Sequence, residues 1–148
     1  MPIDQGATNQ FKVGLASGQF DFNTDTFKMA LYTGAATIGP TTAAYTTTNE
    51  VSGTGYSAGG ETLTVSTTPT TGSNPSNTTM YLSFSNVTWN PASFTCRGAL
   101  VYNSSKSNKS IFVLDFGTNK TVTAGTLTIQ FPTADVNNAI AVISSVTN

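Results

Sequence analysis

The chain of 148 residues has no histidine and a single cysteine, and charged residues make up only 9% of it. Enzymes take most of their general acids, general bases, nucleophiles and metal ligands from His, Cys, Asp, Glu and Lys. That supply is nearly absent here, and the few carboxylates and basic groups are scattered along the chain. A Ser–Lys pair or an Asp/Glu dyad are the remaining routes to catalysis. The composition therefore predicts a non-enzymatic protein with no catalytic residue, no bound metal and no cofactor.

The scarcity of charge and cysteine also limits the partners of this chain. Cys96 has no partner for an intrachain disulfide, and its apolar neighbours predict a small buried side chain. A net charge of −1 gives no attraction toward nucleic acid or an anionic membrane. The longest apolar stretch, 139–143, is too short to cross a bilayer, and the polar start lacks the pattern of a signal peptide. We therefore expect no nucleic-acid or membrane partner, and synthesis in a cytoplasm.

What the chain does contain is a repeated alternation of apolar and hydroxyl-bearing residues, which is typical of half-buried β-strands. Strands are expected at 26–33, 61–67, 80–89 with a bulge near Asn86, 93–102, 111–116, 121–131 and 139–146. A short helix or turn is expected within 9–18. The pattern predicts an all-β fold, an antiparallel β-sandwich or jelly roll of about seven or eight strands with at most one short N-terminal helix.

The length of the chain fits one domain. We expect an unstructured N-terminal arm over 1–8 and a single β-sandwich domain over 9–148. A long loop is expected over 34–60 and a second loop over 68–79, because Gly, Thr, Ser, Asn and Pro are frequent in both. Glycines on both sides of Tyr56 predict that the long loop turns sharply and is ordered.

One short motif matches the first half of an EF-hand calcium loop. Asp21, Asn23 and Asp25 have the spacing of the first three ligands. Thr26 stands where the loop needs glycine, and Tyr32 stands where it needs the bidentate glutamate. The sequence therefore predicts a polar turn rather than a calcium site.

A second motif, G-T-G-Y-S-A at 53–58, fits the dinucleotide-binding pattern G-x-G-x-x-A. That pattern binds a pyrophosphate only when a strand precedes it and a helix follows it. A strand-like segment follows here, so we interpret these glycines as residues that adopt positive φ in a turn.

Asp115 is the carboxylate that most needs a structural explanation, because it lies inside the apolar run 111–116. A carboxylate in a central strand requires a cationic partner, and Arg97 and Lys109 are the candidates. We expect a structural ion pair.

Aromatic residues are the candidates for a binding surface. Phe11, Tyr45 and Tyr56 are the candidate interface residues, the first near the arm and the other two in the long loop. Tyr32 and Trp89 could join such a surface, although packing in the core is the alternative that we favour for both.

Several stretches of the sequence together carry a family resemblance. They read D-T-F-K-M-A-L-Y-T at 25–33, Y-T-T-T-N-E-V-S-G-T-G-Y-S-A-G-G at 45–60, F-T-C-R-G-A-L-V-Y-N at 94–103, V-L-D-F-G at 113–117 and I-Q-F-P at 129–132. With these stretches the chain resembles a group of small virion structural proteins of tailed bacteriophages, over roughly residues 10–145. The turn at 55–60 is the most specific part.

The resemblance implies a virion component without catalytic residues, and a capsid decoration (cement) protein in particular. The implied location is the capsid surface, the implied partner is the major capsid protein, and a homo-oligomer is expected. Two alternatives stay open. One is a structural component of the tail or the head–tail junction. The other is a carbohydrate-binding adhesive module on the virion, which would stack sugars on Tyr45, Tyr56 or Trp89.

Overall fold

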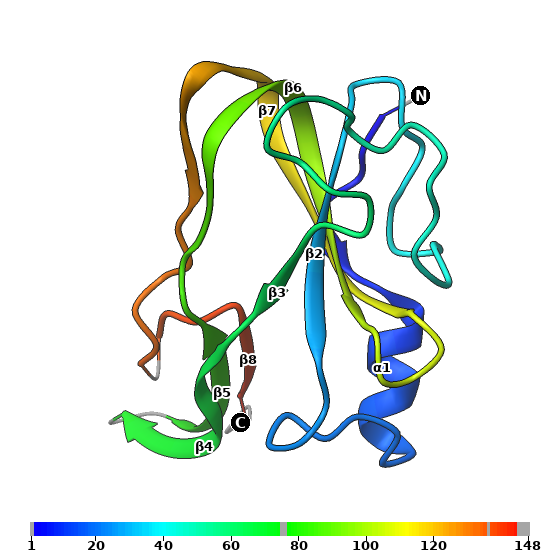
Figure 1. The fold of residues 1–148 in the computed structure, drawn as a ribbon. Coiled ribbons are helices and arrows are strands. Elements are labelled where there is room, and N and C mark those ends of the chain that lie inside the picture. The colour runs from blue at the N-terminus through cyan, green and yellow to red at the C-terminus, as the bar shows by residue number, and fades with distance from the viewer. Residues whose placement is uncertain (1, 75–76, 136, 145–148) are drawn as a thin grey trace. The chain divides into compact units, whose positions relative to one another are not determined.

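The computed structural model describes residues 2–74, 77–135 and 137–144, which contain eight strands and one helix (Figure 1). The elements are β1 (Gly6–Ala7), α1 (Asn9–Ala16), β2 (Phe27–Tyr32), β3 (Glu61–Leu63), β4 (Val65–Asn74), β5 (Asn77–Phe84), β6 (Val87–Asn103), β7 (Lys109–Ile129) and β8 (Ala141–Ser144). One sheet has the order β1-β7-β6-β2-β3, and the other has the order β4-β5-β8. The predicted fold class is confirmed as eight strands in two antiparallel sheets with one short helix.

The chain forms two compact units. The first consists of Met1–Thr62 and Thr88–Leu127, and the second consists of Leu63–Val87 and Thr128–Asn148. The expectation of one domain over 9–148 concerns how these units are joined, and it stays a prediction.

The core of the first unit is built around β2. This strand pairs with β6 in antiparallel register, from Phe27 opposite Asn103 to Tyr32 opposite Gly98. Phe27, Met29 and Leu31 are fully buried on one face, as the alternation predicted. Tyr32 on the opposite face is fully buried as well, so β2 is covered on both sides rather than half-buried. Segments of the chain that pack on either face of β2 are held in place by their contacts with this strand.

The helix α1 begins at a strong N-cap. The Thr8 hydroxyl accepts a hydrogen bond from the Phe11 backbone N–H at 3.2 Å and donates to the Ser110 carbonyl at 2.9 Å. Phe11 then packs its ring against Phe112 of β7, with ring centroids 4.7 Å apart. The short helix expected within 9–18 is therefore confirmed, and its cap and its buried ring both attach it to the first sheet.

The expectation of an unstructured arm over 1–8 is wrong for residues 3–8, and Met1 lies outside the described residues. Gly6 and Ala7 form β1, which adds an edge strand to β7 opposite Val113 and Phe112. Ile3 is only 6% exposed and belongs to a core cluster with these residues: Ala30, Tyr32, Ala36, Ile38, Leu100, Tyr102 and Val113. The polar composition of this segment did not indicate that Ile3 is buried, or that the backbone of Gly6 and Ala7 pairs with β7.

The second unit contains a correction to the expected loops. Residues 68–74 and 77–79 are not a loop, because β4 continues to Asn74 and β5 begins at Asn77; residues 75 and 76 lie outside the described residues. The ladder skips Pro69, since its register shifts between Thr67 and Thr70. A bulge can accommodate a proline that has no N–H to donate to the ladder. The core side chains of this unit include Leu63, Leu82, Phe84 and Val87.

Several strand boundaries also differ from expectation. The segments 111–116 and 121–129 belong to one continuous strand, β7, which also includes residues 117–120; residues 130 and 131 follow its end. The bulge expected near Asn86 is a break between β5 and β6. The last expected strand, 139–146, is β8, which pairs with β5; residues 145 and 146 lie outside the described residues.

The buried position of Ile3 makes the N-terminal segment a contributor to stability. We expect Ile3→Ala to lower the free energy of unfolding by about 2–4 kcal/mol, because it leaves a cavity in the cluster. Val13→Ala is the control, since Val13 on α1 is 61% exposed and should change stability by less than about 0.5 kcal/mol. Urea denaturation measures both. Equal effects of the two variants would contradict the packing described here.

Candidate functional site

The long connection between β2 and β3 is an ordered loop. Among residues 33–60 the only strand-like pairings are isolated bridges, which join Tyr32 to Glu50, Ala44 to Lys109 and Thr54 to Ser93. These bridges attach the loop at three points of the first unit. The loop is therefore a defined surface, although it has almost no regular secondary structure.

Glu50 is the centre of the contacts that hold this loop. Its Oε2 accepts a hydrogen bond from the Tyr45 hydroxyl at 2.7 Å, and its Oε1 accepts one from the Tyr56 hydroxyl at 2.7 Å. Oε1 also accepts the Gly59 N–H at 2.7 Å. Short bonds to an ionised carboxylate are the stronger kind of hydrogen bond. One carboxylate thus gathers three separate points of the loop, and we call Glu50, Tyr45, Tyr56 and Gly59 the Glu50 cluster.

The Glu50 cluster is joined to the strands beneath it. The Tyr56 hydroxyl accepts the Leu31 N–H of β2 at 2.9 Å, in addition to its donation to Glu50. The Tyr102 hydroxyl of β6 donates to the Gly59 carbonyl at 2.8 Å. The Tyr45 ring stacks on the Tyr102 ring, with centroids 4.8 Å apart. The loop is therefore fixed to β2 and β6 by both polar and aromatic contacts.

Gly60 shows why the turn after Tyr56 needs glycine. Its φ is +71°, and a Cβ built there would lie 1.7 Å from the Met29 carbonyl oxygen. The backbone passes too close to β2 for any side chain. The glycines of the 53–60 segment thus serve a tight turn against the sheet. The alternative reading of 53–58 as a dinucleotide-binding pattern fails, because the described residues after it form β3 and not a helix.

The electrostatics of the site keep its tyrosines protonated. Burial raises the pKa of Tyr56 well above its usual range, and its hydrogen bond to Glu50 acts in the same direction. Burial and the Glu50 bond likewise raise the pKa of Tyr45, while burial raises that of Tyr32. Both Glu50 oxygens are occupied by donors of the protein itself, so this carboxylate is suited to holding the loop.

The three candidate interface residues are in different environments. Phe11 is 4% exposed and packs in the core, so it has a structural role in place of the expected contact role. Tyr45 and Tyr56 are half-buried and belong to the Glu50 cluster. Trp89 is 1% exposed, and Tyr56 stacks against it with centroids 6.4 Å apart. The structure brings Tyr45 and Tyr56 together, but their hydroxyls are committed to Glu50.

The half EF-hand motif forms a polar turn, as predicted. Asp21 Oδ1 accepts the Asn23 backbone N–H at 2.8 Å, and its Oδ2 accepts the Thr24 hydroxyl at 2.9 Å. These bonds lower the pKa of Asp21, with the Asn23 backbone bond as the main cause. Asp25 in turn accepts from the Asp21 N–H and from the Asn103 side-chain amide. Among the described residues, no group of three or more His, Cys, Asp or Glu could hold a metal ion.

Two further expectations are confirmed in the first unit. Arg97 Nε lies 2.8 Å from Asp115 Oδ1, so Arg97 is the partner that the sequence left open between Arg97 and Lys109. The Arg97 bond is the main cause of the lowered pKa of Asp115. Cys96 is fully buried, and burial raises the pKa of its thiol to about 11.

In the described part of the chain, no helix is long and apolar enough to span a membrane.

Sequence reasoning missed Glu50, the residue that organises the site. Its side chain looked like a surface carboxylate in a polar loop. The available signal was the co-occurrence of one carboxylate with Tyr45 five residues before it and Tyr56 six residues after it, followed by glycines. That spacing has no helical or strand periodicity, so it does not indicate contact without the fold.

Comparisons of this chain with family models, with curated proteins and with solved structures find no match.

The two tyrosine hydroxyls of the Glu50 cluster should differ in importance. Tyr45→Phe removes one bond to Glu50 and should cost about 0.5–1.5 kcal/mol of unfolding free energy. Tyr56→Phe also leaves the buried Leu31 N–H without its acceptor, which should add about 1–3 kcal/mol. Chemical denaturation of the matched variants measures the difference. Equal losses would show that the bond from Leu31 is unimportant.

The raised pKa values predict a loss of stability at alkaline pH. A folded pKa above the unfolded one contributes stability that is complete below the unfolded value and is lost as the pH rises toward the folded value. The loss should therefore begin near the ordinary cysteine value of 9.0 through Cys96, and steepen above 10.0 through Tyr32, Tyr45 and Tyr56. Each group adds a slope of about 1.4 kcal/mol per pH unit.

Unfolding free energies measured between neutral and strongly alkaline pH would test this. Tyr32→Phe should reduce the slope of the stability curve only above pH 10.0, and Cys96→Ala should remove the loss that begins near pH 9.0. A stability that stays constant throughout this range would contradict the burial of both groups.

Proposed function

We propose that this chain is a non-enzymatic structural protein of a bacteriophage virion, a capsid decoration (cement) protein that binds the outer shell and stabilises it. The proposed partner is the major capsid protein, and the proposed location is the capsid surface. The protein would act as a homo-oligomer, made in the host cytoplasm before it joins the particle.

The observation that carries the proposal is the meeting of the resembling stretches in one cluster. Glu50, Tyr56 and the glycines come from the stretch 45–60, Leu31 from the stretch 25–33, and Tyr102 from the stretch 94–103. The residues behind the resemblance to phage virion proteins are therefore the residues that fix the long loop. This supports a protein whose distinguishing feature is a rigid surface loop rather than a reactive group.

The rigidity of the loop should increase the affinity with which a partner binds to it. A loop that is already ordered loses little conformational entropy when a partner binds, so more of the contact energy becomes affinity. The exposed parts of this loop, including Thr47–Asn49 and Ser52–Gly55, are uncharged. An interface of the standard size, about 1,600 Å², could form over such a surface without burying charges.

The carboxylates of the described chain support a structural role in the same way. Asp21 and Asp135 hold turns, Asp115 pairs with Arg97, and Glu50 holds the loop. The alternative of an adhesive module has less support, because Trp89 is buried and the Tyr45 and Tyr56 rings are stacked against other rings. A sugar would need an aromatic face open to solvent.

The test is the position and copy number of the chain in purified phage particles, measured by cryo-EM and quantitative mass spectrometry. We expect many copies in icosahedral order over the shell, and particles that lack the chain should lose their genome at a lower temperature. A few copies in a ring at one vertex or in the tail would replace the decoration role with the tail or junction alternative. Absence from the particle would contradict the proposal.

A further inference from the structure

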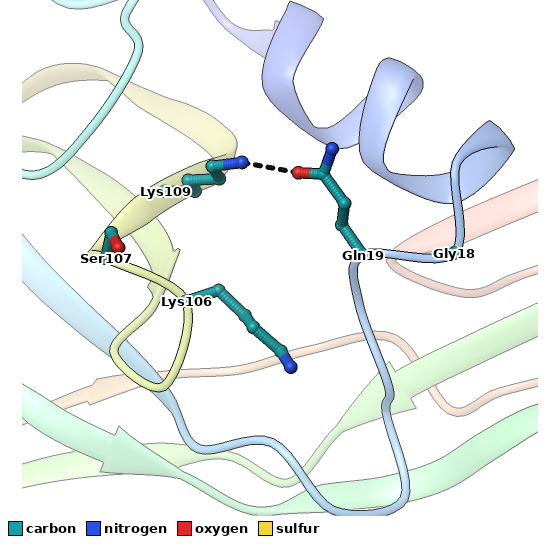
Figure 2. Close-up of a pocket in the computed structure, with 5 residues that line it drawn as sticks. All are labelled: Gly18, Gln19, Lys106, Ser107 and Lys109. Atoms are coloured by element: carbon teal, nitrogen blue, oxygen red, sulfur yellow. Dashed lines mark hydrogen bonds between the residues drawn. The ribbon is translucent and has the colours of Figure 1, made fainter.

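A pocket of about 310 Å³ lies between the end of α1 and the turn that joins β6 to β7 (Figure 2). Its lining residues are Gly18, Gln19, Lys106, Ser107 and Lys109. Figure 2 shows Lys109 pointing at Gln19 across the pocket, while the Lys106 side chain extends toward the lower part of the view. The volume is at the lower end of ligand-binding pockets, so it suits a single side chain or a small ion better than a cofactor.

The pocket carries positive charge that the protein does not fully neutralise. Two of the six basic residues of the chain, Lys106 and Lys109, line it. Lys109 donates through Nζ to the Gln19 side-chain carbonyl, a neutral acceptor, and within the described chain it forms no salt bridge. Lys106 Nζ lies 3.6 Å from Asp25 Oδ1. Of the two ammonium groups that line the pocket, only that of Lys106 is paired with a carboxylate.

The carboxylate that pairs with Lys106 is itself shared. Asp25 Oδ2 accepts the Asn103 side-chain amide at 2.7 Å and the Asp21 backbone N–H at 2.9 Å. Asp25 is therefore held at the side of the pocket by its own bonds, and Lys106 is still 44% exposed at its side chain. An anion entering the pocket would find both ammonium groups able to donate.

Both walls of the pocket are fixed before any ligand arrives. The Lys109 N–H donates to the Lys106 carbonyl at 3.2 Å and closes the turn. The Asn108 carbonyl accepts the Tyr45 N–H at 2.9 Å, which ties this turn to the long loop. On the opposite wall the Gln19 N–H donates to the Gly14 carbonyl of α1 at 2.9 Å. The pocket is therefore preorganised, and it adjoins the loop that we propose as a contact surface.

We propose that this pocket docks an acidic side chain of a neighbouring protein subunit. The incoming carboxylate replaces the Gln19 carbonyl as the acceptor for Lys109 and takes a second bond from Lys106. Charge-assisted bonds of this kind are about twice as strong as neutral ones. Charge complementarity and continuity with the loop favour a protein carboxylate over a free ion. That the subunit is a capsid protein rests on the proposed function; the docking of a carboxylate does not.

The test is an NMR titration of the isotope-labelled full chain with three probes: a blocked triglutamate peptide, a blocked triglutamine peptide and inorganic phosphate. We expect saturable shifts at the amides of Gly18, Gln19 and the 106–109 turn with triglutamate alone. Lys109→Met should weaken this binding about threefold to fivefold, the effect of one partly exposed ion pair. Lys120→Met removes the same charge from β7, outside the pocket lining, and should leave the binding unchanged.

The outcomes separate the sources of the anion. Equal shifts with triglutamine would show that charge is not recognised, and binding of phosphate alone would assign the pocket to a free ion; either result overturns the proposal. No saturable shift with any probe overturns it too. If Lys109→Met does not fold, Lys106→Gln, whose side chain is exposed, carries the same expectation.

A second measurement separates this proposal from the proposed function. Occupancy of the Lys109→Met variant on particles should fall relative to that of Lys120→Met. If the peptide binds but the chain never joins a particle, the decoration role fails while the docking pocket stands. If the chain decorates particles and occupancy is the same for both variants, the pocket is not used in that contact, and its assignment to a neighbouring subunit is overturned.

Discussion

The order of the long loop between β2 and β3 depends on the hydrogen bonds that the Glu50 carboxylate accepts. A long loop without regular secondary structure loses a large conformational entropy when it is ordered, at about 1–2 kcal/mol for each residue of backbone. Here one carboxylate accepts three donors from positions 45, 56 and 59, and two of those positions continue into the sheet through Leu31 and Tyr102. The loop is therefore ordered by contacts with the most deeply buried strands.

The strands show which features a local pattern can predict. The fully buried β2 lies within one residue of its expected ends at either side, because its apolar residues alternate and its turn residues are distinct. The interpretation failed where tertiary contacts overrode composition. Pro69 is accommodated at a register shift of β4, and the polar N-terminal segment is held by Ile3 and by backbone pairing with β7.

The candidate site was predictable only in part. Tyr45 and Tyr56 could be selected because aromatic residues in a polar loop need an explanation, and both belong to the site. Glu50 could not be selected, since its role depends on donors that converge only after the loop returns to β2 and β6. Phe11 was selected as a candidate because it is close to the expected arm in sequence. In the structure its ring packs in the aromatic core, so it does not belong to the site. The local sequence identifies side chains that need a bonding partner, but only the folded structure shows which residue that partner is.

The hydroxyl-rich pairing between β6 and β7 has a consequence for the conditions in which the protein can work. The Thr95 and Thr121 hydroxyls lie 2.8 Å apart, Thr126 donates to the Asn90 side chain at 3.0 Å, and the described chain holds only two salt bridges, both partly exposed. Neutral hydrogen bonds are not screened by ions, whereas exposed ion pairs are. The stability of the fold should therefore change little between fresh water and brine, and ionic strength would act mainly on the Arg97–Asp115 pair and on the two lysines of the pocket.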